Sequence, residues 1–148
     1  NDRIIFAGRL DSMEEHLGRY RLADLFLDTT PFNAHTTAID SLKAGLPILT
    51  LAGNSFAARV CCSLLKTMNL PELVTYSTEE YETLAIELAK HPKKLKHLRQ
   101  KLASNQSSSP LFDASLFTKL LEDAYEAMYM LHHSNQSPQP INVSCIKR

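Results

Sequence analysis

Short apolar runs rich in β-branched and aromatic residues alternate along the chain with polar segments of helical character. The apolar runs occupy residues 3–8 (RIIFAG), 24–29 (DLFLDT), 46–53 (LPILTLAG) and 72–77 (ELVTYS). Runs of this length and composition, bounded by turn residues, predict strands. Residues 12–23, between the first two runs, have helical or turn character.

The polar segments between these runs have the apolar spacing of amphipathic helices. A helix is expected over residues 36–44, with Ile39 and Leu42 on one face and Gly45 in the position of a left-handed C-terminal cap. A further helix follows residue 55 and ends before Pro71. The remainder of the chain is predicted to be largely helical, over about 78–88, 92–103 and 113–131.

Strands separated by single helices imply parallel crossovers, so the sequence predicts an α/β fold with a Rossmann-like, doubly wound parallel sheet. We expect one lobe over residues 1–133, including extra C-terminal helices, and an irregular polar tail over residues 134–148. In such sheets ligands bind beyond the carboxyl ends of the strands. The segment that follows residue 29 lies at such an end.

The composition is that of an ordinary globular domain. The 148 residues are 44% hydrophobic and 22% charged, and 16 Lys and Arg balance 16 Asp and Glu. This balance provides no overall field to attract nucleic acid or an anionic membrane, so neither is expected as a partner. No apolar run reaches the roughly 18 residues of a membrane span.

The three cysteines, Cys61, Cys62 and Cys145, have no metal-ligand spacing. We therefore expect reduced thiols in a cytoplasmic protein, without zinc. The basic segment 90–101 (KHPKKLKHLRQK) has leucines on one side and no interleaved aromatic residue, so a solvated helix is favoured over an RNA-binding surface.

The segment LDTTPFNAHTTAID, residues 27–40, contains the main candidate for chemistry. A helix that begins near Thr36 presents unpaired backbone N–H groups and the positive end of its dipole to the preceding loop, which favours an anion. The hydroxyls of Thr36 and Thr37 and the ring of His35 add further donors. The alternative is simple capping without a ligand, since Thr37 and Asp40 fit the capping-box pattern, Thr36 alone can cap, and His35 can be a loop residue whose hydrogen bonds are satisfied within the protein.

Residues 22–60, LADLFLDTTPFNAHTTAIDSLKAGLPILTLAGNSFAARV, resemble the nucleotide-binding lobe of the O-linked N-acetylglucosamine transferases. The likeness is greatest to bacterial relatives fused to tetratricopeptide repeats, and it extends over about residues 3–130. It implies the C-terminal, donor-binding half of a two-lobed GT-B glycosyltransferase. By this resemblance His35, Thr36 and Thr37 hold the diphosphate of UDP-N-acetylglucosamine as it leaves, and Asp40 accepts hydrogen bonds from the ribose.

The resemblance also implies a uracil site on the segment 11–19. The family histidine and arginine that contact the base correspond to His16 and Arg19. Met13 stands where better-known members have a lysine, so we expect backbone contacts near Asp11 instead. The pattern alone favours a solvated helix face for His16 and Arg19, and only the spacing that they share with the family indicates a base site.

The function implied by the resemblance is inverting transfer of N-acetylglucosamine from UDP-N-acetylglucosamine to Ser or Thr of a protein acceptor. The family residues that bind the acceptor correspond to positions upstream of Arg3, so we expect a fragment that is inactive alone and that can dimerise. No metal and no cofactor beyond the UDP-sugar substrate is expected, because the chain has no Asp-x-Asp pair. Two alternatives stay open: a non-catalytic UDP- or anion-binding scaffold, and a relative that uses UDP-glucose.

Overall fold

The computed structural model describes residues 2–143 of the chain. The chain divides into two compact units, residues 1–108 and 109–148. All candidate site residues belong to the first unit. The boundary of the lobe expected at residue 133 stays a prediction.

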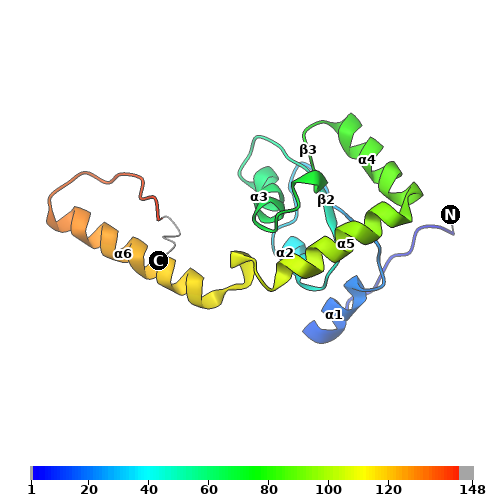
Figure 1. Ribbon diagram of the computed structural model, residues 1–148, viewed down its shortest axis with the longest axis horizontal. Helices are drawn as coiled ribbons and strands as arrows, with labels where there is room; N and C mark the ends of the chain where they lie inside the picture. The colour runs from blue at the N-terminus through cyan, green and yellow to red at the C-terminus, as the bar shows by residue number, and fades with distance from the viewer. Residues whose placement is uncertain (1, 144–148) are drawn as a thin grey trace. The chain divides into compact units, whose positions relative to one another are not determined.

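The first unit is built around a parallel sheet of three strands (Figure 1). The strands are β1 (Phe26–Leu27), β2 (Ile48–Leu51) and β3 (Val74–Thr75), in the order β1-β2-β3. Phe26 pairs with Ile48, and Thr50 pairs with Val74. Three of the four predicted strands are therefore confirmed, each shorter than its apolar run.

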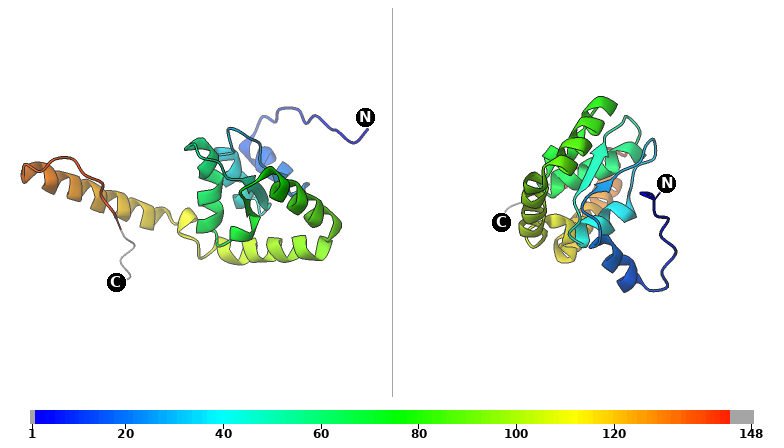
Figure 2. Two further views of the ribbon diagram at one scale, coloured as in Figure 1. Left: turned by 90° about the horizontal axis from the view of Figure 1, so that it is seen from above. Right: turned by 90° about the vertical axis from the view of Figure 1, so that its right-hand side faces the viewer.

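Helices cover both faces of this sheet. Helix α2 (Thr36–Lys43) connects β1 to β2, and a 3-10 turn (Ala57–Arg59) followed by α3 (Val60–Thr67) connects β2 to β3. Helix α2 packs against α3 and β2, whereas α4 (Thr78–Lys90) packs against β2, β3 and α5 (Pro92–Gln106). Consecutive residues Ile48, Leu49 and Thr50 are all buried, as expected for a strand with both faces covered (Figure 2). The predicted α/β class with a parallel, Rossmann-like sheet is confirmed.

The local signals that end and begin helices are largely confirmed. Gly45 has φ 83°, so it occupies the left-handed region immediately after α2, where a side chain would be strained. The Glu80 backbone N–H donates to Ser77 Oγ at 3.2 Å, and Glu80 Oε2 accepts from the backbone N–H of Tyr76 at 2.8 Å. The capping pattern at the start of α4 therefore forms.

The strand predicted over residues 3–8 is wrong. Residues 4–10 have no regular structure, and Ile5 and Phe6 are 88% and 93% exposed. An apolar run becomes a strand only where a neighbouring strand completes its hydrogen bonds, and none pairs with this run among the described residues. The following helix, α1 (Met13–Tyr20), is confirmed and begins at Ser12, whose Oγ accepts from the Glu15 N–H.

The second unit contains the 3-10 turn Pro110–Phe112 and helix α6 (Ala114–His133). The helix expected over residues 113–131 is confirmed. Leu116, Leu120 and Ala124 recur at helical spacing and form an apolar stripe, yet no residue of α6 is buried. The described part of this unit has no second helix or sheet against which a stripe could pack. Residues 136–143 are in no helix or strand, and residues 144–148 of the expected tail, with Cys145, lie outside the described residues.

Helix α5 contains the basic segment and is confirmed as an amphipathic helix. Leu95, Leu98 and Leu102 are buried. On its other side Lys94 pairs with Glu87 at 2.8 Å and Lys101 with Glu72 at 2.7 Å, so part of its charge is neutralised within the lobe. Among residues 2–143 no helix is long and apolar enough to cross a membrane.

Candidate functional site

The loop between β1 and α2 is anchored by Asp28, the residue that follows β1. Asp28 is only 4% exposed. Its Oδ1 accepts from the backbone N–H groups of Thr29 at 3.0 Å and Ala34 at 2.7 Å, and its Oδ2 accepts from Thr50 Oγ1 at 2.6 Å. The carboxylate therefore connects both ends of the loop to the middle strand.

Asn33, in the same loop, is tied to strand β2. Its Nδ2 donates to Thr50 Oγ1 at 3.0 Å and to the carbonyl oxygen of Leu51 at 2.9 Å. Its Oδ1 is buried and has no hydrogen-bond partner among the described residues. Leaving a buried acceptor unpaired costs about 1–3 kcal/mol, so Asn33 maintains the loop conformation at some cost in stability.

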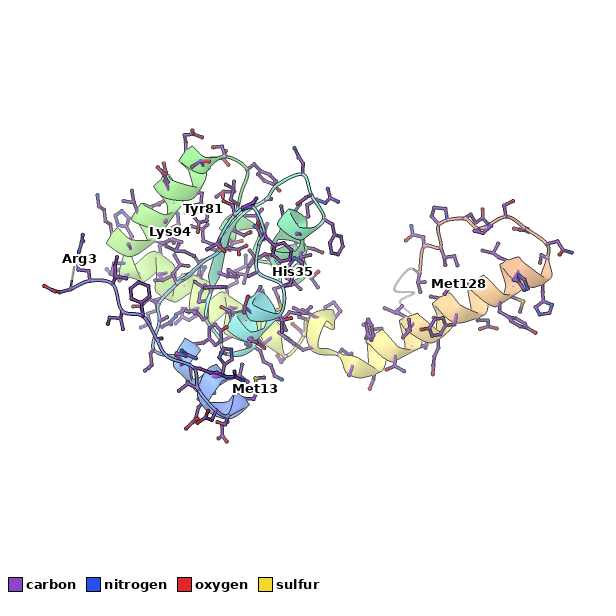
Figure 3. The ribbon with its side chains drawn as sticks, turned by 180° about the vertical axis from the view of Figure 1, so that it is seen from behind. Arg3, Met13, His35, Tyr81, Lys94 and Met128 are labelled. Carbon is purple, nitrogen blue, oxygen red and sulfur yellow. The ribbon has the colours of Figure 1, made fainter. Side chains whose placement is uncertain are left out.

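His35 is the N-cap residue of α2 and is held from two sides. Its Nε2–H donates to the carbonyl oxygen of Ala57 at 3.2 Å, and since a carbonyl only accepts, this bond places a proton on Nε2. The ring stacks on Phe32, with centroids 5.0 Å apart, and meets Phe56 edge-on at 6.2 Å. Figure 3 labels His35 beside α2. Both phenylalanines are exposed, at 69% and 75%.

The start of α2 has no side-chain cap. Among residues 2–143 no side chain bonds to the first helical N–H groups, so the capping alternative built on Thr36, Thr37 and Asp40 is wrong. Thr36 and Thr37 are exposed, and within the described residues their hydroxyls make no hydrogen bond. Two backbone N–H groups, two hydroxyls and the positive end of the helix dipole therefore face solvent at the carboxyl edge of the sheet.

Helix α1 brings a second group of candidates to α2. His16 Nε2 lies 3.9 Å from Asp40 Oδ2, and both side chains are partly exposed. Arg19 donates through one guanidinium nitrogen to the carbonyl oxygen of Gly8 at 2.8 Å and through the other to His16 Nδ1 at 3.4 Å. Because a guanidinium only donates, Nδ1 of His16 is an acceptor and Nε2–H points toward the carboxylate.

Tyr20 completes this second group. Its ring meets that of His16 edge-on, with centroids 5.3 Å apart. Burial, reinforced by the Asp40 carboxylate, raises the pKa of the Tyr20 phenol, while Arg19 opposes the shift. The distance of 3.9 Å from His16 to Asp40 is too long for a hydrogen bond, so the carboxylate is available to an incoming hydroxyl.

Asp11 and Met13 lie at the entrance to α1. Both are exposed, Asp11 in a bend and Met13 as the first residue of the helix, labelled in Figure 3. No hydrogen bond joins Asp11 to the other candidates among residues 2–143. The structure thus brings together His16, Arg19 and Asp40 in one cluster and His35, Thr36 and Thr37 in another, both on or against α2.

A cavity of about 430 Å³ opens at the carboxyl edge of the sheet, and its lining includes none of His35, Thr36, Thr37 and Asp40. All three strands contribute the residues that follow them: Thr30 and Asn33 after β1, Gly53 and Ser55 after β2, and Tyr76 and Thr78 after β3. This is where ligands bind in open parallel sheets. A larger, mainly apolar cavity lies along β1, α4 and α5 and contains none of the candidates.

Cys61, from α3, is fully buried behind this edge and is a free thiol, as is Cys62. Burial, with the nearby Asp28 carboxylate, raises the pKa of Cys61 to about 12. A thiol with such a pKa is protonated at neutral pH and is a poor nucleophile. No cluster of three or more His, Cys, Asp or Glu side chains within residues 2–143 is arranged to hold a metal ion.

Sequence reasoning missed the anchoring residues. Asp28, Asn33 and Thr50 are part of strands or loops whose polar character looks unremarkable in the sequence. A carboxylate at the end of an apolar strand is the one available signal, because a buried charge requires donors nearby. Which donors meet it depends on how β1 and β2 align.

The parallel sheet and the open start of α2 beyond its strand ends are typical of a nucleotide-binding α/β lobe. The model of glycosyl transferase family 41 matches residues 1–121, and the chain belongs to this family. The chain is 41% identical over 143 residues to a probable UDP-N-acetylglucosamine–peptide N-acetylglucosaminyltransferase, SEC, of Arabidopsis thaliana, covering 96% of this chain and 14% of that protein.

Two further relatives agree with this assignment. The UDP-N-acetylglucosamine–peptide N-acetylglucosaminyltransferase of Caenorhabditis elegans is 36% identical over 132 residues, covering 89% of this chain and 11% of that protein. A solved structure of a mutant O-GlcNAc transferase of Thermobaculum terrenum has a TM-score of 0.75 and 36% identity, covering 80% of this chain and 23% of that chain. The chain thus spans a small part of the length of the relatives it matches.

Proposed function

We propose that this chain is the donor-binding lobe of a protein O-N-acetylglucosaminyltransferase and binds UDP-N-acetylglucosamine. The observation that supports this most directly is the open start of α2, where unpaired amides and the hydroxyls of Thr36 and Thr37 stand beside His35. The diphosphate of the donor is the anion that this arrangement suits. The names of the relatives from Arabidopsis thaliana and Caenorhabditis elegans give UDP-N-acetylglucosamine as the donor and a peptide as the acceptor.

The cluster of His16, Arg19 and Asp40 is the proposed binding site for the nucleoside. Asp40 lies one helical turn beyond Thr36 and Thr37, so a ribose bound there can donate its hydroxyls to the carboxylate while the diphosphate lies at the helix start. His16 and Arg19 on α1 then line the side where the uracil projects, with Asp11 supplying backbone contacts. Arg19 already orients His16 through the 3.4 Å contact.

In this proposal the lobe stabilises the leaving UDP. As the bond between the sugar and the β-phosphate breaks, negative charge develops on the phosphate oxygens. Donors fixed in advance around that charge lower the barrier without any metal. The acceptor and its activating base are supplied outside this chain, so the chain alone transfers no sugar to a protein.

The test is a transfer assay with radiolabelled UDP-N-acetylglucosamine, made on the longer protein that contains this chain. The variant His35→Ala removes the imidazole beside the phosphates, in which Nε2–H is held by Ala57 and Nδ1–H of the protonated ring is the group left to donate to a phosphate oxygen. The transfer rate is expected to fall about 10- to 100-fold, since a hydrogen bond to a charged group contributes about 1.5–3 kcal/mol. His97→Ala, on the exposed side of α5, is the matched control and should leave the rate unchanged.

The outcomes separate the remaining alternatives. An unimpaired His35→Ala enzyme would remove the diphosphate assignment. A longer protein that binds UDP but transfers no sugar would be a scaffold, and one that transfers glucose in preference to N-acetylglucosamine would be a relative with a different donor. Transfer by the 148-residue chain alone would contradict its assignment as half of the active site.

A further inference from the structure

Asp28 is only 4% exposed, and among the described residues its carboxylate makes no hydrogen bond to the side chains of His35, Thr36 and Thr37. Its three acceptor contacts are to the Thr29 and Ala34 amides and to Thr50 Oγ1, at 3.0, 2.7 and 2.6 Å. A fourth contact involves its own carbonyl oxygen, which accepts from the hydroxyl of Tyr81, a residue of α4, at 2.8 Å. Figure 3 labels Tyr81. Asp28 therefore links the loop, the middle strand and a helix on the other face.

No ion pair compensates this carboxylate within residues 2–143. A negative charge near an anion site weakens anion binding by repulsion, so another interaction of Asp28 must offset this loss. The hydrogen bonds that Asp28 accepts offset it, because they are strong and fix the direction of the loop. Bonds to a carboxylate are shorter and stronger than bonds between neutral groups, and two of the three here are 2.7 Å or less.

The bond to Ala34 determines how the chain enters α2. Ala34 directly precedes His35, the N-cap residue, whose ring is held from the opposite side by the carbonyl oxygen of Ala57. With the Ala34 amide turned inward to Asp28, the following amides of Thr36 and Thr37 are left to face solvent. Thr50 reinforces this arrangement, since its hydroxyl donates to Asp28 and accepts from Asn33.

We propose that Asp28, with Thr50, is a positioning residue for the diphosphate: it holds residues 29–35 so that the start of α2 faces the ligand. This inference rests on the proposed function, and it assigns a role to residues that never touch the donor. It predicts that loss of the network weakens binding of the phosphates and leaves contacts to the nucleoside largely intact.

Strand β3 offers a matched control for this test. Thr75 is a buried strand threonine like Thr50, and its Oγ1 donates to the carbonyl oxygen of Thr50 at 2.9 Å without contacting the loop. Thr50→Val and Thr75→Val both replace one buried hydroxyl by a methyl group. Calorimetric titration with UDP is expected to show affinity about tenfold lower for Thr50→Val and within about twofold of wild type for Thr75→Val.

Further measurements separate loss of the phosphate contacts from a general loss of stability, and one of them, hydrogen exchange, needs no ligand. Binding of uridine, which has no phosphate, should be the same in both variants. Amide hydrogen exchange of Thr29 and Ala34, whose N–H groups donate to Asp28, should be faster in the ligand-free chain of Thr50→Val than in that of Thr75→Val, because the loop loses an anchor only in the first. Asp28→Asn, which keeps an acceptor oxygen for the Ala34 amide, should bind UDP better than Asp28→Ala.

The results distinguish failure of this inference from failure of the proposed function. Equal UDP affinity and equal exchange rates in Thr50→Val and Thr75→Val would overturn the positioning role of the network. If the wild-type chain did not bind UDP, the proposed donor site would fail. Exchange rates would then still show whether Asp28 and Thr50 hold the loop, and unchanged rates in Thr50→Val would reject that as well.

Discussion

His16 Nε2 lies 3.9 Å from Asp40 Oδ2, so two helices that are separated along the chain by strand β1 present their polar side chains to one place. Helix α1 contacts α2 along this line. A ring N–H and a carboxylate that approach each other without a hydrogen bond form a pair that a third group can bridge. In the proposed complex the ribose and the base of UDP are that third group.

The first prediction concerns Asp40. Asp40→Ala removes the acceptor for the ribose hydroxyls, and UDP affinity should fall about tenfold, since a hydrogen bond to a charged group contributes about 1.5–3 kcal/mol. Calorimetry with UDP and with 2′,3′-dideoxy-UDP separates this contact from others. The variant should bind the dideoxy ligand as wild type does, and an equal loss for both ligands would contradict a role in binding the ribose. Asp24→Ala, an exposed carboxylate paired with Arg99, is the control.

A second prediction concerns metals. In the proposed site, a helix start, two hydroxyls and His35 neutralise the charge of the diphosphate, so UDP affinity should be the same in millimolar EDTA and in millimolar Mg²⁺. Titrations under the two conditions check this. A loss of binding in EDTA would show that a cation holds the phosphates instead.

Cys61 gives a prediction about pH. Its pKa is raised to about 12 mainly by burial, whereas an unfolded cysteine ionises near pH 8.5–9. The protonated thiol therefore favours the native state fully below the unfolded pKa, and this contribution is lost as the pH rises toward 12. Between pH 8 and 11 the free energy of unfolding should fall more steeply for the wild-type chain than for Cys61→Ala.

Urea denaturation of the two proteins across this range measures the difference directly. Native Cys61 should also react slowly with thiol reagents at pH 8, since it is fully buried and protonated. If the free energy of unfolding changed equally with pH in the wild-type chain and in Cys61→Ala, the thiol would have the same pKa in the folded and unfolded chain.

Elements with a strong local signal could be predicted from the sequence. The helix over 36–44 followed by Gly45, and the cap at Ser77, depend on neighbouring residues alone, and both are found. Residues 3–8 have the composition of a strand, yet whether they pair depends on a partner that no local pattern specifies. The stripe on α6 is a similar case, because a helical periodicity shows which side is apolar but not what covers it.

The candidate site was predictable in part for the same reason. His35, Thr36 and Thr37 form a recognisable pattern because they are contiguous and open a helix. The contact between His16 and Asp40 required α1 to pack against α2, which only the resemblance implied. The network of Asp28, Asn33 and Thr50 depends on the register of two strands and on a loop conformation, and no sequence spacing encodes either.

In the proposed complex, α2 and α1 together form a site for uridine diphosphate. Calorimetric titration of the 148-residue chain with UDP, UMP and ADP measures how each part of that site contributes to affinity. UDP should bind more tightly than UMP, because the second phosphate gains the donors at the helix start. UDP should also bind much more tightly than ADP, because His16 and Arg19 line the position of the base. Equal affinities for UDP and ADP would contradict the uracil site, and equal affinities for UDP and UMP would contradict the diphosphate site at His35, Thr36 and Thr37.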